Sequence, residues 1–363
     1  MSWKIQACLI ALLVLIGGNA ANGQGKRKVI IDQDAAGPGG TDMQAILALV
    51  NSPDTEVLGI TVLTGDAWRD EEVQHTLRLL EIIGRPDIPV LPGAVFPLVN
   101  SKEYMLGWEK LYGKQVYMGA WNFAKGYAVH GPYEIPPMPE GAPKIKASEE
   151  HASHFLRRMA RTYPHEVTIY AAGPMTDLAL AIADDPEFAG LTKELIVMGG
   201  SINPTTDDPE FALSPTHEFN FWMDPEATRA VLHAKWPRLV LTTVDISVKT
   251  RMGKELIDEI RKSPTPAAQY VAKYAEPNIL WDELAAVAWL DSSIITKWKM
   301  LYLDVDVGHG SGYGNTIVWP EGRQPGLGEI EGEVQDDLDK EKFYREFVEL
   351  MARPTPRATK NEK

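Results

Sequence analysis

The sequence contains one cysteine among its 363 residues, Cys8, and this residue lies in an apolar segment near the N-terminus. The rest of the chain therefore has no disulfide, no thiol nucleophile and no cysteine-ligated metal. An Asn-x-Ser/Thr glycosylation sequon is also absent, because Asn203 is followed by Pro204. Basic residues are few: 36 Lys and Arg face 50 Asp and Glu, which gives a net charge of −14. Such an acidic chain repels phosphate backbones, so no nucleic acid partner is expected.

The first 23 residues have the features of a secretory signal peptide. Lys4 supplies a positive charge, residues 5–16 are almost wholly apolar, and small residues follow at 17–21. The apolar run is too short to span a membrane, so cleavage around residues 20–23 is favoured over a membrane anchor. We therefore expect an exported protein, periplasmic or secreted, with no stable membrane insertion after the signal is cleaved.

Beyond this segment, short runs rich in β-branched residues alternate with amphipathic helical patterns. Such alternation predicts a parallel α/β sheet. The predicted strands are 28–32, 56–63, 88–91, 166–171, 193–198 and 238–244. The predicted helices are 43–50, 70–83, 147–162, 175–184, 225–234, most of 263–289, and 340–351.

One domain is expected over residues 24–352, because the sequence shows no internal repeat and no break in composition. Residues 95–147 hold many Pro, Gly, Tyr and Trp residues and little periodicity, which predicts a long insertion or lid. Residues 353–363 are expected to form a flexible tail.

The sharpest chemical signal is the segment Asp32-Gln-Asp34-Ala-Ala-Gly-Pro-Gly-Gly-Thr-Asp42. Asp32 and Asp34 stand at the carboxyl end of the first predicted strand, and Asp42 follows a glycine-rich loop at the start of a helix. Open parallel sheets bind ligands outside these strand ends. Three converging carboxylates without a nearby Lys or Arg favour a hard divalent cation such as Ca²⁺. The alternative is that Asp34 and Asp42 are turn and N-cap residues.

Other motifs for nucleotide binding or nucleophilic catalysis are absent from the sequence. The glycine loop lacks GxGxxG spacing, because Asp42 stands where the last glycine should be, and no GxxxxGK[ST] occurs. Residues 308–314 look like a nucleophile elbow, but Ser311 has His309 and Tyr313 two residues away instead of glycines. We interpret this segment as a flexible turn.

Six segments, in order along the chain, resemble motifs of the nucleoside hydrolases (the inosine-uridine-preferring nucleoside hydrolase family). The first resembles the family's DxDxGxDD, and the second resembles its second-strand motif. The others resemble A-L-G-P-L-T-N, VMGG, EFN-x-x-x-DP and HDPLAVA. The six segments are residues 32–42, 59–66, 172–177, 197–200, 218–225 and 281–288. This resemblance implies an open, mainly parallel α/β sheet flanked by helices, and hydrolysis of the N-glycosidic bond of ribonucleosides.

The resemblance also implies a catalytic Ca²⁺ at the strand ends. Asp34, Asp42, Asp282 and the backbone carbonyl of Thr176 would be its protein ligands. The cation would lower the pKa of a bound water, and Asp34 would take the proton as general base. The transition state would resemble an oxocarbenium ion, as in other glycoside cleavage.

A ribose-binding set follows from the same resemblance. Glu218 and Asn220 would hydrogen-bond to the 5′ side of the ribose, and Met198 would line the sugar pocket. Asp66 stands where the family usually has Asn, and it joins this set. Two alternatives stay open, namely that Met198 is plain core and that Glu218 is a surface residue at the start of a helix.

Three departures from the family pattern concern the sugar contacts. The loop from Asp34 to Asp42 is three residues longer than usual. Thr41 stands where the family has the first Asp of its DD pair, which normally helps to bind the ribose. Ala212 occupies the position of a ribose-binding Asn in many members, and Asn203 is the candidate to substitute for it.

The predicted base pocket favours purines. Trp281 replaces the histidine that protonates the leaving base in the inosine-uridine type. The purine-specific branch has a tryptophan at this position, a second one in the loop after the third strand, and an Asp at the position of Asp66. Trp108 lies in the matching loop, so Trp281 and Trp108 are predicted to sandwich the purine, although a core or surface role is an equal alternative for Trp108. Other tryptophans available for the second position are Trp68, Trp121 and Trp222.

Three hypotheses about function remain. A purine nucleoside hydrolase is favoured, and a hydrolase of other ribosides, such as pyrimidine nucleosides or nicotinamide riboside, is the second. The third is a nucleoside- or carbohydrate-binding protein without turnover, which Thr41 and Ala212 support. The expected partner is a small-molecule nucleoside. Because relatives are commonly dimers or tetramers, the resemblance also makes a homo-oligomer possible.

Overall fold

The computed structural model describes residues 25–122 and 129–357. The predicted signal peptide, residues 1–23, lies outside the described residues.

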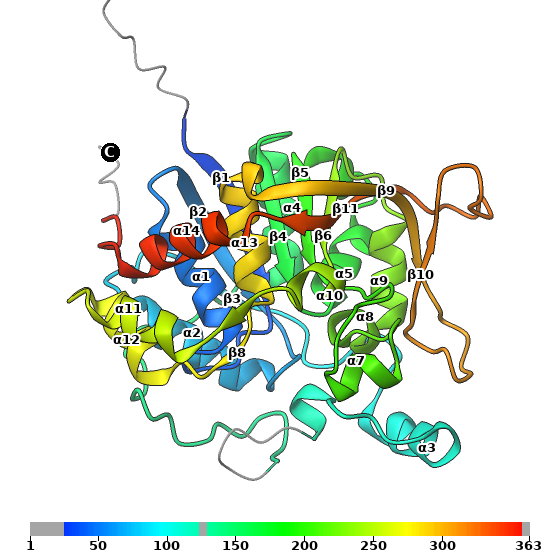
Figure 1. Ribbon diagram of the computed structural model, residues 1–363, viewed down its shortest axis with the longest axis horizontal. Helices are drawn as coiled ribbons and strands as arrows, with labels where there is room; N and C mark the ends of the chain where they lie inside the picture. Colours follow the sequence, from blue (N-terminus) through cyan, green and yellow to red (C-terminus); the bar gives the residue numbers. More distant parts are fainter. Residues whose placement is uncertain (1–24, 123–128, 358–363) are drawn as a thin grey trace, which may run out of the picture.

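A single large sheet forms the centre of the fold. Its strands are β1 (Arg27–Gln33), β2 (Thr55–Val62), β3 (Val90–Pro92), β4 (Val167–Ala172), β5 (Glu194–Met198), β6 (Leu239–Thr242), β9 (Ile295–Val305), β10 (Thr316–Trp319) and β11 (Glu331–Leu338). Their order across the sheet is β10-β9-β11-β6-β5-β4-β1-β2-β3 (Figure 1). All neighbours from β11 to β3 pair in parallel, whereas β9 runs antiparallel to both β10 and β11. The predicted open, mainly parallel α/β sheet is therefore confirmed.

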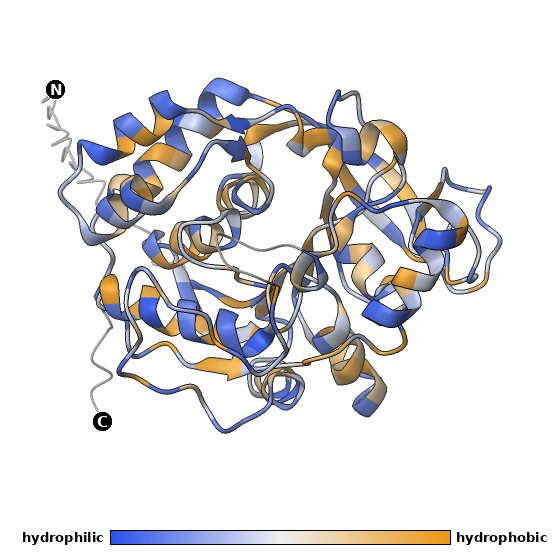
Figure 2. Cartoon of the chain, turned by 90° about the horizontal axis from the view of Figure 1, so that it is seen from below, coloured by the Kyte–Doolittle hydropathy of each residue, from blue (hydrophilic) through white to orange (hydrophobic). Residues whose placement is uncertain are grey.

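Helices cover both faces of the sheet, because alternate residues of a strand point to opposite sides. On β1, Val29 and Ile31 join one buried cluster and Ile30 joins another. The first face is covered by α1 (Thr41–Asn51), α2 (Arg69–Ile82), α11 (Lys254–Arg261), α12 (Pro266–Tyr274), α13 (Asp282–Leu290) and α14 (Lys340–Ala352). The second face is covered by α4 (Ala152–Thr162), α5 (Thr176–Asp184), α6 (Phe188–Leu191) and α9 (Pro225–Leu232). The helices around the sheet carry both hydrophobic and hydrophilic sides (Figure 2).

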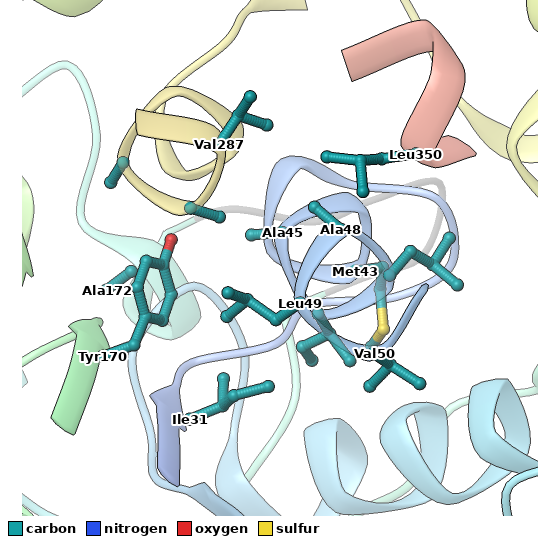
Figure 3. Packing of buried hydrophobic residues seen from close by; sticks show 14 of the residues in the cluster. Ile31, Met43, Ala45, Ala48, Leu49, Val50, Tyr170, Ala172, Val287 and Leu350 are labelled. Atoms are coloured by element: carbon teal, nitrogen blue, oxygen red, sulfur yellow. The ribbon is translucent and has the colours of Figure 1, made fainter. Parts of the chain in front are cut away.

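Helix α1 is buried along its whole length apart from its first residue, Thr41. It packs between the sheet and helices α13 and α14, with Leu49 near Tyr170 of β4 and Ala48 near Leu350 of α14 (Figure 3). This packing fixes the N-terminal turn of α1 beside the start of α13, at the carboxyl edge of the sheet.

The insertion at residues 95–147 contains more regular structure than we predict from its weak periodicity. Helix α3 (Lys102–Tyr112) projects from the body, and a 3-10 turn follows at η1 (Gly119–Trp121) (Figure 1). Ser101 caps α3 by accepting a hydrogen bond from the Tyr104 N–H at 3.1 Å. The buried side of α3 packs on a local cluster of mainly aromatic residues.

Buried His–Glu pairs attach the last part of the insertion to α2. His130 Nε2 lies 3.0 Å from Glu71 Oε2, and His75 hydrogen-bonds to Glu140. Because Glu71, His75 and Glu140 are all buried, these pairs are structural links between the insertion and the core.

Strands β9, β10 and β11 extend the sheet where the sequence predicts no strand. The middle of β9, residues 296–300, is exposed, although Lys297 and Lys299 alternate there with Trp298 and Met300. Its pairing with β11 is supported by ion pairs across the strands, Lys297–Asp337 at 3.3 Å and Lys299–Asp336. Such cross-strand pairs are invisible to a reading of local hydrophobicity.

The predicted helical region 263–289 is interrupted. Helix α12 ends at Tyr274, and β8 (Asn278–Ile279) then pairs with β7 (Arg251–Met252) before α13 begins. Pro277 lies in this break, where it removes a backbone donor and disfavours continued helix. The interruption places Trp281 and Asp282 at the start of α13, at the edge of the sheet.

The first residues of the predicted tail contact the body. Thr355 Oγ1 donates to Asn51 Oδ1 at 2.7 Å, and the Arg85 guanidinium donates to the Pro356 carbonyl at 3.5 Å. Residues 358–363 lie outside the described part of the chain. No helix among the described residues is both long and apolar enough to cross a bilayer.

Candidate active site

A cavity of about 370 Å³ opens at the carboxyl ends of β1, β4 and β5. Asp34 follows β1, Ala172 ends β4 and Met198 ends β5, while Trp281 and Asp282 reach the cavity from the start of α13. This is the edge at which an open parallel sheet binds its ligand, and the volume suits a small molecule.

The lining of the cavity is strongly acidic. The described residues that line it include nine carboxylates and no Lys, Arg or His. Burial raises the pKa of Glu210 to about 8 and that of Glu283 to about 8. A cavity of this charge disfavours anions and favours a cation or a neutral, hydroxyl-rich ligand. The nine carboxylates are Asp34, Asp42, Asp66, Asp208, Glu210, Glu218, Glu276, Asp282 and Glu283.

Asp34 lines the cavity and is held in place by a backbone hydrogen bond. Its Oδ2 accepts a hydrogen bond from the Asp66 N–H at 3.1 Å, and its residue is only 2% exposed. Two glycines make room for the carboxylate: a Cβ at Gly65 would lie 2.0 Å from Asp34 Oδ2, and one at Gly173 would lie 2.8 Å from Oδ1. Burial, followed by the charges of Asp66 and Asp42, raises the pKa of Asp34 well above its ordinary value.

Asp42 and Asp282 meet across the cavity from the first turns of α1 and α13. Gln33 lies between them, and its Nε2 donates to Asp42 Oδ1 at 3.1 Å and to Asp282 Oδ2 at 2.6 Å. Burial, followed by the charge of Glu283, raises the pKa of Asp282, and hydrogen bonds from Asp42 and Gln33 oppose the shift. The N-cap of α1 is Gly40, so the alternative that Asp42 is an N-cap residue is wrong.

The donor set at this edge fits a hard cation in its chemistry. Asp34, Asp42 and Asp282 present buried carboxylate oxygens, the ligands that Ca²⁺ prefers, and Asp42 and Asp282 both raise the pKa of Asp34. Within the described residues, no group of three or more His, Cys, Asp or Glu is gathered closely enough to be a ready-made metal site. The Gln33 amide instead supplies the donor that joins two of the three carboxylates.

Asp32 does not join the carboxylates that line the cavity, although the sequence groups it with Asp34 and Asp42. It accepts a hydrogen bond from Thr61 Oγ1 of β2 at 2.5 Å, and burial raises its pKa to about 7. Asp32 lies inside β1, whereas Asp34 follows the last residue of the strand, Gln33. Asp32 points to the face opposite Gln33, and Gln33 is the residue that contacts the cavity carboxylates.

The predicted sugar-binding residues Met198, Glu218 and Asn220 all line the cavity. Asn220 Nδ2 donates to the Met198 carbonyl at 3.1 Å. Glu218 is buried and caps α8 (Phe219–Met223), where its two oxygens accept from the backbone N–H groups of Asn220 and Phe221. Glu218 therefore starts a helix, as the alternative interpretation has it, but it faces the cavity and not the surface.

Aromatic side chains line the cavity as well. Trp281 packs against Phe211 of α7 (Pro209–Leu213), with ring centroids 5.6 Å apart. Tyr117 of the insertion packs against Phe219 at 4.9 Å and hydrogen-bonds to Asp66. We did not single out these last three aromatic residues from the sequence. Phe219 lies inside the EFN segment, which is a usable signal, whereas Tyr117 lies in an insertion where no pattern marks it.

Three residues expected at the site do not line the cavity. The Thr176 hydroxyl donates to Asp224 Oδ2 at 2.7 Å. Asn203 is exposed, and its backbone N–H donates to Asp245. The Trp108 indole donates to the Gly310 carbonyl at 2.8 Å, which docks α3 on the turn at residues 308–314. The structure brings together the other predicted site residues, namely Asp34, Asp42, Asp66, Met198, Glu218, Asn220, Trp281 and Asp282.

An open α/β sheet with an acidic, oxygen-rich cavity at its strand ends defines an enzyme for a small polar ligand. A family model described as inosine-uridine preferring nucleoside hydrolase matches residues 29–345. The chain is 30% identical over 248 residues to probable uridine nucleosidase 2 of Arabidopsis thaliana, which covers 68% of each protein. It is 28% identical over 247 residues to the pyrimidine-specific ribonucleoside hydrolase RihA of Photobacterium profundum, which covers 68% of this chain and 70% of that relative. Among solved structures, a purine-preferring ribonucleoside hydrolase from Gardnerella vaginalis matches with a TM-score of 0.72 and 21% identity, over 90% of this chain and 98% of that one.

The chain therefore belongs to the inosine-uridine preferring nucleoside hydrolase family. It is an N-glycosyl hydrolase whose substrates are small-molecule nucleosides.

Proposed function

We propose that the chain hydrolyses purine ribonucleosides with a Ca²⁺ ion held by Asp34, Asp42 and Asp282. The observation that carries the proposal is the convergence of these three buried carboxylates, from three different elements, in a cavity whose described lining has no basic residue. The Thr176 carbonyl is left out of this ligand set, because Thr176 does not line the cavity.

When bound, the cation would lower the pKa of a water molecule and orient it at the sugar. Asp34 lines the cavity and is held by the Asp66 N–H, so it is placed to take a proton from a nucleophile as general base. Glu218 and Asn220 also line the cavity and would bind the sugar, and hydrogen bonds to the backbone hold both side chains in place.

The acidic lining also supports a preference for nucleosides over nucleotides. A phosphate group would have to enter among nine carboxylates without a Lys or Arg in the described lining to pair with it. An anion that is buried without a cationic partner loses its hydration with no compensation, so phosphorylated ligands would be rejected.

Purine preference is supported by the apolar side of the cavity. Trp281 and Phe211 offer adjoining aromatic surfaces, which suit the larger of the two base types. Pyrimidine nucleosides are the second candidate, because two relatives carry the names uridine nucleosidase and pyrimidine-specific ribonucleoside hydrolase.

The test is release of reducing sugar from inosine, adenosine, guanosine and uridine, in CaCl₂ and in chelator. We expect release from the three purine nucleosides, with loss of activity in chelator. Trp281→Ala should raise KM for inosine more than for uridine, because the larger base loses more stacking surface. Sugar release from none of the four would contradict the proposed reaction. Uridine cleaved as fast as inosine would leave the reaction standing and overturn the purine preference.

Asp34→Asn tests the general base. The substitution keeps the size of the side chain and removes its ability to take a proton, so turnover should fall by about 100-fold or more. Asp54→Asn, at an exposed position, is the matched control and should keep full activity. An active Asp34→Asn variant would rule out the assigned role.

A further inference from the structure

Thr41 and Glu283 form a hydrogen-bonded couple between α1 and α13. The Thr41 hydroxyl donates to Glu283 Oε2, and the same Thr41 oxygen accepts from the Asp282 N–H at 3.3 Å. Both side chains line the cavity, although Glu283 is only 1% exposed. Thr41 precedes Asp42 and Glu283 follows Asp282, so the couple adjoins the proposed cation site on two elements.

These two residues are also two departures from the motifs of the family. Thr41 stands at the first Asp of DxDxGxDD, and Glu283 stands at the proline of HDPLAVA. One position has lost a carboxylate and the other has gained one. The hydrogen bond between the two side chains places the additional carboxylate of α13 beside the position on α1 that lacks one.

A purely structural role does not account for Glu283. Burial of a carboxyl group is unfavourable unless a cation or several hydrogen bonds compensate it, and an apolar residue at the same place is commonly as stable or more so. The described cavity lining offers no Lys, Arg or His to compensate it. A buried carboxyl group that faces a ligand cavity is placed instead to accept hydrogen bonds from the ligand.

We propose that Glu283 binds a hydroxyl group of the ribose, and that Thr41 is the positioning residue that holds the Glu283 carboxylate in place. This inference rests on the proposed ribonucleoside substrate. It assigns to Glu283 the sugar-binding role of the aspartate that is missing at the position of Thr41.

The decisive experiment moves the carboxylate back to α1. Glu283→Ala should lower kcat/KM for the best ribonucleoside by about 10-fold, the value of one hydrogen bond. Adding Thr41→Asp to this variant should bring kcat/KM back to within about 3-fold of the wild-type value. Glu341→Ala, which also removes a carboxylate from the second residue of a helix but at an exposed position, is the control and should change nothing.

Inhibition constants for the 2′-deoxy and 3′-deoxy analogues then test whether a sugar hydroxyl is the contacted group. Analogues that are not cleaved still report binding in this assay. One of the two analogues lacks the hydroxyl group that Glu283 contacts. For this analogue, Glu283→Ala should raise the inhibition constant by less than about 3-fold, because the hydrogen bond is absent in either enzyme. Thr41→Ser should retain wild-type KM, whereas Thr41→Val should raise it.

Three results would overturn the inference. These are an unchanged kcat/KM in Glu283→Ala, equal losses for both deoxy analogues and the ribonucleoside, or a folded double variant that Thr41→Asp does not rescue. If Glu283→Ala does not fold, Glu283→Gln in the same assays replaces it, since it keeps the shape of the side chain. A wild-type chain that releases no sugar would instead refute the proposed function, on which the inference rests.

Discussion

Gln33 provides the strongest test of how the cavity carboxylates are held together. Its amide is fully buried and donates to both Asp42 and Asp282, and in Gln33→Met a side chain of similar size would lack the donor. Each hydrogen bond to a charged partner contributes about 1.5–3 kcal/mol. Gln33 Oε1 has no partner among the described residues, and removing that unsatisfied oxygen returns about 1–3 kcal/mol. The expected net loss is about 3 kcal/mol, or a fall in Tm of about 5 °C for a chain of this size.

Gln44→Met is the matched control for this substitution. Gln44 is also buried with an unsatisfied Oε1, but its Nε2 makes a single hydrogen bond to the neutral Gly39 carbonyl at 3.1 Å. A bond of this kind contributes about 0.5–1.5 kcal/mol and removal of the unsatisfied oxygen returns about 1–3 kcal/mol, so Gln44→Met should leave the stability unchanged or slightly higher. Thermal unfolding of both variants in chelator should separate them by about 3 °C or more.

Addition of excess Ca²⁺ should narrow this difference. A cation that binds only the folded state stabilises that state. Bound Ca²⁺ would also stabilise Asp42 and Asp282 in the variant that lacks the Gln33 amide. Equal Tm values for the two glutamine variants in chelator would refute the idea that Gln33 compensates these charges.

Two further predictions concern pH and processing. Burial raises the pKa of Asp32 to about 7 and that of Glu283 to about 8, so between pH of about 4.5 and 8 the folded state holds protons that the unfolded state has released. In chelator the free energy of urea unfolding should therefore decrease as pH rises through this window, and a flat or rising profile would contradict the assignment. We also propose export, so N-terminal sequencing of the protein from a periplasmic or secreted fraction should find a start near residues 21–24, whereas an intact N-terminus there would exclude signal cleavage.

The parts of the fold that the sequence predicts are those built from local patterns. The apolar runs of β1, β2, β4, β5 and β6 mark buried strands, and the carboxylates at strand ends and helix starts mark the cavity edge. Asp34, Asp42 and Asp282 were assigned to the site by motif resemblance, and all three line the cavity. Their convergence depends on the order of strands in the sheet, which follows from packing and not from local sequence.

The parts that the sequence does not predict depend on partners far along the chain. Gln33 is one polar residue at the end of an apolar strand, and its importance appears only when α1 and α13 bring Asp42 and Asp282 against it. Tyr117 reaches the cavity through an insertion without a periodic pattern, because Phe219 packs against it. Strand β9 pairs with β11, which lies further along the chain, and Lys297 faces Asp337 across this pair.

The buried carboxylates of the proposed active site lower the stability of the folded state. Asp42 and Asp282 lie in the first turns of two buried helices, where the helix dipoles favour negative charge by only about 0.3–1 kcal/mol each. That gain is small beside the several kcal/mol that an uncompensated buried carboxylate costs. The remainder must come from the surrounding fold, chiefly the packing of α1 between the sheet, α13 and α14. The fold therefore holds the carboxylates together before a ligand arrives, and binding of a cation should stabilise the whole domain as well as complete the site.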